Sequence, residues 1–196
     1  RAGAWAEVIV AWRLVRDKTD VGIVGSLGLL TDEEADSRAS EGLNHYNDNI
    51  ETSRRYFDTI VSTHEFEDRL KTLRRAKQAG MDLCAGVILG MGETPTDRVD
   101  AALELRKIGV SSLPVNILNP IKGTPLGDRE SAAISKTDLI KTIAVYRLLH
   151  PTARVRLTGG REVNLAEDEQ HWPFGAGADG LLTGDYPTTC LLITTY

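Results

Sequence analysis

Short apolar stretches rich in β-branched residues alternate with longer amphipathic stretches along most of the chain. The short stretches predict buried strands, and the longer ones, with a 3.6-residue period, predict helices. The predicted strands are residues 21–24, 43–47, 81–89, 113–118, 154–157 and 180–183. The predicted helices are residues 8–18, 31–42, 63–80, 94–109 and 135–149, and one that begins near residue 164. This order predicts about six β/α units on a parallel sheet, and therefore an α/β fold.

Helix-start and helix-stop residues support these boundaries. Thr31 stands three residues before Glu34, which is the spacing of a capping box. Pro95 occupies a first helical position, with Asp97 two residues further on. Gly80 follows a segment that is acidic at its start and basic at its end, as the helix dipole favours.

The length of 196 residues sets the architecture. No linker or shift in composition divides residues 1–196, so we expect one domain. A closed (β/α)8 TIM-type barrel takes about 250 residues, so six units fit an incomplete barrel or an open sheet. The chain begins with Arg1 and then a helical pattern, and we expect a fragment that starts within a unit, roughly the C-terminal three quarters of a barrel.

Composition narrows the class of protein. The formal net charge is −5 and no basic block is present, which argues against binding to nucleic acid or an anionic membrane. No apolar run approaches the roughly 20 residues of a membrane helix. Two cysteines cannot build a disulfide framework. We therefore expect a soluble, cytoplasmic domain.

Polar residues follow the second predicted strand at two-residue spacing. Asn47, Asn49 and Glu51 project to one side if this segment stays extended. In a barrel, chemistry takes place where strands end at their C-terminal side. An Asn-rich turn that satisfies its own backbone explains the same residues equally well.

Two strand residues are candidates for a site inside the barrel. Cys84 lies in an apolar strand, where a free cysteine is often simply a small buried hydrophobe. Arg156, between Val155 and Leu157, is predicted to point into the interior, so it should face an anion, a carboxylate or a metal-bound ligand. The alternative is an arginine at the strand edge in solvent.

Other polar features have ordinary explanations. The glycine-bearing turns at residues 90–94 and 158–162 could offer backbone N–H groups to an anion, but tight turns explain them equally well. The histidines show no metal-ligand spacing and are interpreted as structural. Arg69, in a charged helix, is interpreted as part of a solvated face. The residues alone thus indicate a barrel-like α/β enzyme without indicating its reaction.

Five strings at the strand ends, taken in order, resemble the biotin synthase family of radical S-adenosylmethionine enzymes. They are Tyr46-Asn47-Asp48-Asn49-Ile50-Glu51-Thr52-Ser53, Cys84-Ala85-Gly86, Gly90-Met91-Gly92-Glu93-Thr94, Pro114-Val115-Asn116 with Gly123-Thr124-Pro125-Leu126, and Arg156-Leu157-Thr158-Gly159-Gly160-Arg161-Glu162. Each is weak alone, but five in the family's order are specific. Residues 110–190 also resemble a region that biotin and thiamine synthesis proteins share.

The resemblance implies a radical S-adenosylmethionine barrel and a sulfurtransferase activity. It implies a 4Fe–4S cluster, S-adenosylmethionine, and an auxiliary iron–sulfur cluster of 2Fe–2S or variant type. Cleavage of S-adenosylmethionine gives a 5′-deoxyadenosyl radical that takes hydrogen from dethiobiotin, and the auxiliary cluster supplies the sulfur of biotin. A flavodoxin- or ferredoxin-type reductant and a homodimer are implied as well.

The same resemblance assigns the binding pockets by motif position. Asn49 and Asn116 would hydrogen-bond dethiobiotin. Glu51 would hold the ribose of S-adenosylmethionine, with Arg69 and the backbone near Ile88 completing that pocket, which Asn49 also lines. No residue of this chain is assigned a catalytic role.

Cys84 and Arg156 would ligate the auxiliary cluster. Val24 stands where many members of the family carry a further cysteine ligand, and Asp48 replaces a usual histidine. Cys190, in a tail that departs from the family, is assigned no role. The family's Cys-x3-Cys-x2-Cys loop for the 4Fe–4S cluster is absent from this sequence, and we expect it upstream of residue 1, so that this portion alone is inactive.

Two other functions stay open from the sequence. One is a barrel lyase or aldolase that uses the glycine turns for phosphate and no radical chemistry. The other is a non-catalytic remnant that keeps the dethiobiotin pocket through Asn49 and Asn116. Phosphate binding without iron would indicate the first, and dethiobiotin binding without turnover would indicate the second.

Overall fold

The computed structural model describes residues 2–129 and 133–182. The strands are β1 (Ile23–Gly25), β2 (Leu43–Asn47), β3 (Asp82–Cys84), β4 (Val87–Leu89), β5 (Ser112–Ile117), β6 (Arg154–Leu157) and β7 (Gly180–Leu181). The helices are α1 (Ala2–Lys18), α2 (Asp32–Ser40), α3 (Arg54–Phe57), α4 (Phe66–Gln78), α5 (Pro95–Ile108), α6 (Lys136–Leu149), α7 (Arg161–Asn164) and α8 (Trp172–Gly175), with a 3₁₀ turn η1 (Glu167–Glu169).

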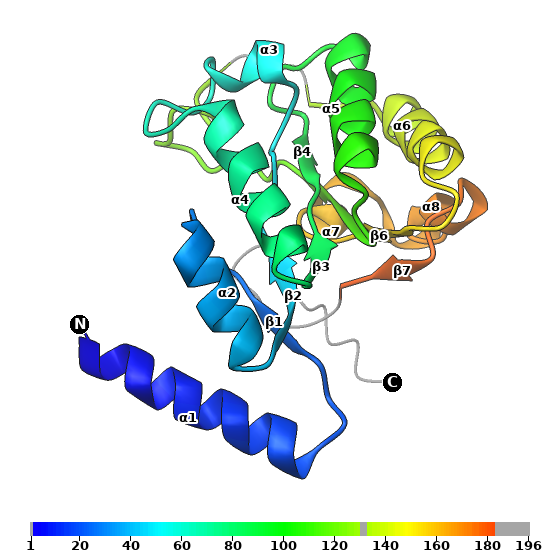
Figure 1. The fold of residues 1–196 in the computed structure, drawn as a ribbon. Coiled ribbons are helices and arrows are strands. Elements are labelled where there is room, and N and C mark those ends of the chain that lie inside the picture. The colour runs from blue at the N-terminus through cyan, green and yellow to red at the C-terminus, as the bar shows by residue number, and fades with distance from the viewer. Residues whose placement is uncertain (1, 130–132, 183–196) are drawn as a thin grey trace.

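All paired strands are parallel, in the order β1-β2-β3-β5-β6-β7, and β4 extends the pairing of β3 along β5. Helices α2, α4, α5 and α6 lie one beside the next over one face of this sheet (Figure 1). The sheet curls as part of a cylinder, with the helices outside. The expected α/β fold, an incomplete TIM-type barrel, is confirmed.

The two faces of the sheet differ in chemistry. In β5 the residues that face the helices are apolar and buried, namely Leu113, Val115 and Ile117. Ser112 and Asn116 alternate with them and lie on the opposite, concave face, where both are partly exposed. A TIM barrel normally fills its interior with branched apolar side chains. Polar residues here indicate that the interior accommodates something other than a packed core.

The helix caps expected from the sequence are present. Thr31 and Glu34 form a complete capping box on α2. Thr94 and Asp97 form another on α5, behind Pro95 in the first turn. These reciprocal bonds satisfy backbone N–H groups that the first helical turn leaves without partners.

Helix α1 begins at Ala2 rather than at residue 8, and three further boundaries differ from the predictions. The stretch 81–89 forms two strands rather than one, because Gly86 turns its peptide toward the extension of β2, where Ile50 N donates to Gly86 O at 3.0 Å. Helix α4 begins at Phe66, since Glu65 and Asp68 complete a capping box that Thr63 or His64 could not.

The third boundary lies near residue 164, where the sequence predicts a helix start. Helix α7 instead ends at Asn164, whose side-chain amide donates to the carbonyl oxygens of Gly160 and Leu118. The short helix α3 was not predicted, because four residues carry too little periodicity. Strand β7 is described to Leu181, and Thr183 and Cys190 lie outside the described residues.

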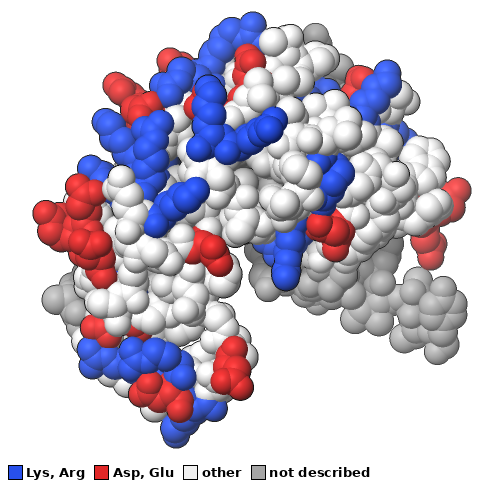
Figure 2. Space-filling model, turned by 45° about the vertical axis from the view of Figure 1, so that its right-hand side comes forward, with Lys and Arg blue, Asp and Glu red and all other residues white. Residues whose placement is uncertain are grey.

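Charges of both signs are interspersed on the face drawn in Figure 2, and no large patch of one sign occupies it. This distribution agrees with the net charge of −5. No helix in the described part of the chain combines the length and the apolar character that crossing a bilayer requires.

Candidate functional site

Cys84 and Arg156 meet on the concave face, although they come from β3 and β6 with β5 between them. Arg156 Nη2 lies 3.1 Å from Cys84 Sγ. Cys84 is 7% exposed. Arg156 Nε is buried and has no hydrogen-bond partner among the described residues. Arg156 therefore points into the interior, as its strand position predicts, and it carries a charge there that no described carboxylate neutralises.

Val24 stands on the same face, in β1. Strands β1, β3 and β6 are alternate strands of the sheet, and alternate strands supply the side chains of one layer in a barrel. Val24 is 60% exposed, but its isopropyl group offers no donor atom to a metal. Of these three alternate-strand residues, Cys84 and Arg156 are the two that carry a possible ligand atom.

Asn49 and Asn116 are both oriented by backbone amides. Asn49 Oδ1 accepts a hydrogen bond from Gly86 N at 3.0 Å. Asn116 Oδ1 accepts from Gly159 N at 3.0 Å and from Thr158 Oγ1 at 2.7 Å. Asn116 Nδ2 also donates to Val87 O at 3.3 Å, and the Asn49 side chain hydrogen-bonds to Glu51, so each amide keeps one further N–H group for a ligand. Two amide donors held by backbone contacts suit the recognition of a neutral, carbonyl-bearing ligand.

Glu51 follows Asn49 at the end of β2 in a left-handed conformation, with φ of 65°. Its carbonyl oxygen accepts from Ile88 N at 2.8 Å, which fixes the backbone of β4 beside it. Its Oε2 is buried without a partner among the described residues. Burial raises the pKa of Glu51, and the nearby Arg69 guanidinium only partly offsets this effect. A strained, buried carboxylate with a free oxygen is a candidate ligand-binding group.

Arg69 is the cation beside Glu51, and its side chain is 18% exposed rather than solvated. Its Nη1 donates to Asp48 Oδ1 at 2.6 Å and to Asn49 O at 3.0 Å. Its Nε donates to His64 Nε2 at 2.8 Å. The interpretation of Arg69 as part of a solvated helix face is therefore wrong, because the first turn of α4 faces the end of β2.

His64 and Asp48 are site residues that the reasoning from sequence missed. His64 was interpreted as structural, and no spacing signal connects it with Asp48, which lies 16 positions earlier in the chain. Burial raises the pKa of Asp48, while Arg69 opposes that shift. Asp48 Oδ2 is buried and has no partner in the described part of the chain.

The glycine turn at residues 90–94 binds a carboxylate of its own chain. Glu93 accepts from Gly90 N at 3.0 Å and from Met91 N at 2.8 Å, and it pairs with Arg98 at 2.8 Å. These amides are therefore not free for a phosphate. In the second turn, Gly159 N is occupied by Asn116.

Comparisons with known families agree with this architecture. The model described as "Radical SAM superfamily" matches residues 5–105, about half of the chain. The model described as "Biotin and Thiamin Synthesis associated domain" matches residues 114–191. The chain belongs to the radical SAM superfamily.

Curated relatives narrow the resemblance. The chain is 76% identical over 189 residues to a biotin synthase of Natronomonas pharaonis, covering 96% of this chain and 51% of that protein. It is 45% identical over 182 residues to a biotin synthase of Heliobacterium modesticaldum, covering 93% of this chain and 55% of that protein. The resemblance to biotin synthases is thus confirmed, and the chain spans about half the length of the curated relatives it matches.

Solved structures share the fold. A methylornithine synthase superposes with a TM-score of 0.75 at 20% identity, covering 94% of this chain and 55% of that structure. A maturase of the [FeFe]-hydrogenase superposes with a TM-score of 0.71 at 18% identity, covering 89% of this chain and 41% of that structure. At these identities the likeness establishes the barrel-type fold and nothing about the ligands.

Proposed function

We propose that the intact protein is a biotin synthase, which inserts sulfur into dethiobiotin in a reaction that depends on S-adenosylmethionine. The observation that carries this proposal is the pairing of Cys84 with Arg156 on a polar concave face, at 3.1 Å. A closed barrel would bury this face, where a thiol and an unneutralised guanidinium need a polar or anionic occupant. An iron–sulfur cluster is such an occupant.

The residues fit the auxiliary cluster in part. Cys84 offers a thiolate, the common ligand of iron–sulfur clusters, and Arg156 offers nitrogen atoms, of which Nε has no partner in the described chain. Val24 offers nothing at the position where many members of the family carry a cysteine. We therefore propose that Cys84 and Arg156 contribute two ligands and that the position of Val24 contributes none.

The polar groups at the end of β2 suit S-adenosylmethionine. Glu51 keeps a buried oxygen without a partner, which suits the hydroxyl groups of a ribose. Arg69 presents a fixed cation, and the backbone of Ile88 is held in place by Glu51. We propose that these residues, together with Asn49, bind S-adenosylmethionine.

Dethiobiotin is the proposed substrate, and Asn49 and Asn116 are its proposed binding residues. When bound, the clusters and S-adenosylmethionine would supply the electron, the hydrogen-abstracting 5′-deoxyadenosyl group and the sulfur atom. The chain's own residues orient the substrate. Gly86 N and Gly159 N hold the amide groups of Asn49 and Asn116 in place, so the N–H group that each amide keeps free can meet a urea-type carbonyl without reorganising the site.

The resemblance also supplies the partners of the intact protein. A flavodoxin- or ferredoxin-type protein is the proposed electron donor, a homodimer is the proposed assembly, and the cytoplasm is the proposed location. A lyase or aldolase function is less well supported, because side chains of the same chain occupy Gly90 N and Met91 N in one glycine turn and Gly159 N in the other.

The test is a turnover assay with the intact protein, reconstituted anaerobically with iron and sulfide and supplied with a reductant, S-adenosylmethionine and dethiobiotin. Mass spectrometry should detect both biotin and 5′-deoxyadenosine. Binding of dethiobiotin without either product would instead identify the non-catalytic remnant. The absence of both binding and turnover would contradict the proposal.

A further inference from the structure

Among the described residues, His64 is linked to the proposed S-adenosylmethionine-binding residues through Arg69. Its Nε2 accepts from Arg69 Nε at 2.8 Å, and its Nδ1 lies 2.9 Å from Thr63 Oγ1. A guanidinium can only donate, so Nε2 must be the unprotonated nitrogen and Nδ1 must carry the proton. Phe57 packs edge-on against the imidazole, with 5.6 Å between ring centroids, which restricts its rotation.

The remaining donors of Arg69 show what this arrangement achieves. A guanidinium has five N–H donors, of which Arg69 gives one to His64, one to Asp48 and one to the carbonyl of Asn49. These contacts fix the guanidinium plane through Nε and Nη1. Nη2 donates to none of the described residues, so its two N–H groups are available to a ligand.

We infer that His64 is a positioning residue, which holds Arg69 so that Nη2 meets an acceptor group of bound S-adenosylmethionine. This inference rests on the proposed function. Asp48 and the carbonyl of Asn49 both contact Nη1, so neither of them restrains the Nε edge of the guanidinium. His64 supplies the second anchor, on Nε, and thereby sets the direction of Nη2.

One test needs no cofactor. In two-bond ¹H–¹⁵N correlation spectra of the metal-free intact protein at pH 8, the His64 signals should show an unprotonated Nε2 and a protonated Nδ1. The H64Q variant assigns these signals by their loss. A protonated Nε2 at this pH would overturn the inference, because it cannot accept from Arg69.

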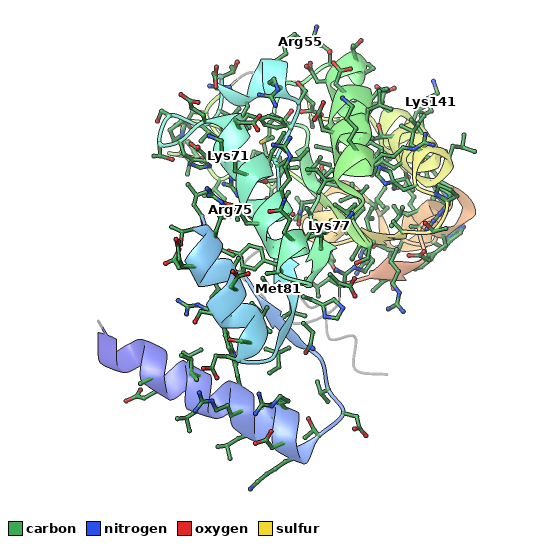
Figure 3. All side chains as sticks on the ribbon, in the orientation of Figure 1. Arg55, Lys71, Arg75, Lys77, Met81 and Lys141 are labelled. Atoms are coloured by element: carbon green, nitrogen blue, oxygen red, sulfur yellow. The ribbon has the colours of Figure 1, made fainter. Side chains whose placement is uncertain are left out.

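The second test measures affinity. In the intact protein with its 4Fe–4S cluster assembled, calorimetry should show S-adenosylmethionine binding about tenfold more weakly to H64L, which removes the acceptor. H64Q, whose amide oxygen can accept, should restore most of the affinity. Lys71, on the exposed side of α4 (Figure 3), provides the control K71A, which should bind as the wild type does.

The outcomes separate the two claims. Wild-type affinity in H64L, or no recovery in H64Q while both variants keep the wild-type unfolding temperature, would overturn the positioning role. If the wild type itself binds no S-adenosylmethionine, the proposed function fails, and the tautomer of His64 still decides whether the hydrogen-bond arrangement exists.

Discussion

Cys84 Sγ and Arg156 Nη2 lie 3.1 Å apart although 72 positions separate them in the chain. The contact spans β5, so it depends on the correct register of three parallel strands. Parallel pairing through helical crossovers brings the two residues to one face, where neither has a described acidic partner. Spacing along the sequence could not give this distance between the two residues that we propose as cluster ligands.

Replacing Cys84 with serine should remove the auxiliary cluster. The hydroxyl is a poor substitute for a thiolate at iron, so C84S should lose the visible absorption and Mössbauer signals of that cluster while keeping those of the 4Fe–4S cluster. Cys190 provides the matched control, and C190S should keep both sets of signals. A complete auxiliary-cluster spectrum in C84S would contradict the ligand assignment.

Replacing Asn49 with aspartate exchanges an NH₂ donor for a carboxylate oxygen. The change preserves size and retains an oxygen for Gly86 N. We therefore expect N49D to bind dethiobiotin about tenfold more weakly, or worse, in equilibrium titration. Unchanged affinity would show that Asn49 does not donate to the substrate.

Replacing Glu51 with glutamine should stabilise the metal-free protein at neutral pH. Burial raises the pKa of Glu51 above its ordinary value of 4.5, so the folded state holds this proton more tightly than the unfolded state does. The stability this carboxyl contributes is therefore complete below pH 4.5 and is lost as the pH rises through the folded-state pKa. E51Q should unfold at a higher temperature than the wild type at pH 7, and the difference should shrink toward pH 4.

Glu67 provides a control, because its pKa is shifted in the opposite direction to that of Glu51. Hydrogen bonds from Arg54 and Arg74 lower the pKa of Glu67, so its ionised form favours folding at pH 7. E67Q should therefore be slightly less stable than the wild type at that pH.

An E51Q protein less stable than the wild type at pH 7 would show that the Arg69 interaction outweighs the cost of burying the charge. E51Q should also bind S-adenosylmethionine more weakly. Together, the two results would show that the Glu51 carboxylate lowers the stability of the fold while it contributes to ligand binding.

Asp97 should act as a structural anchor of the site. It accepts from Ser53 Oγ and Thr94 Oγ1, each at 2.6 Å, and pairs with Arg55 at 2.8 Å. Burial alone would raise the pKa of Asp97, but these hydrogen bonds outweigh it and lower the pKa below its ordinary value of 3.8. Its stabilisation is therefore present above pH 3.8 and is lost as the pH falls toward the folded-state pKa.

The D97N variant should lower the free energy of unfolding at pH 7 by about 2 kcal/mol, because charge-assisted bonds become weaker neutral ones. Urea unfolding at pH 7 and pH 3 measures this change. The loss should be smaller at pH 3, because below pH 3.8 the Asp97 carboxyl of the unfolded chain takes up a proton while the native carboxylate still resists protonation. An equal loss at both pH values would mean that the charge of Asp97 contributes little.

The sequence by itself determined the parallel β/α order, because strand and helix periodicities differ and Thr31, Thr94 and Pro95 mark helix starts through local backbone chemistry. It also indicated an interior position for Arg156, since alternation along a strand is a local property. The five motif strings indicated the family, which the comparisons bear out.

Only the tertiary structure decided which partners the polar groups have. His64 and Asp48 meet at Arg69 because the loop into α4 folds back onto the end of β2, and Glu93 occupies its own glycine turn. The division of residues 81–89 into two strands depends on hydrogen bonds to Ile50 and Asn49 from another strand's extension. Such contacts join residues far apart in the chain, and neither periodicity nor capping carries information about them.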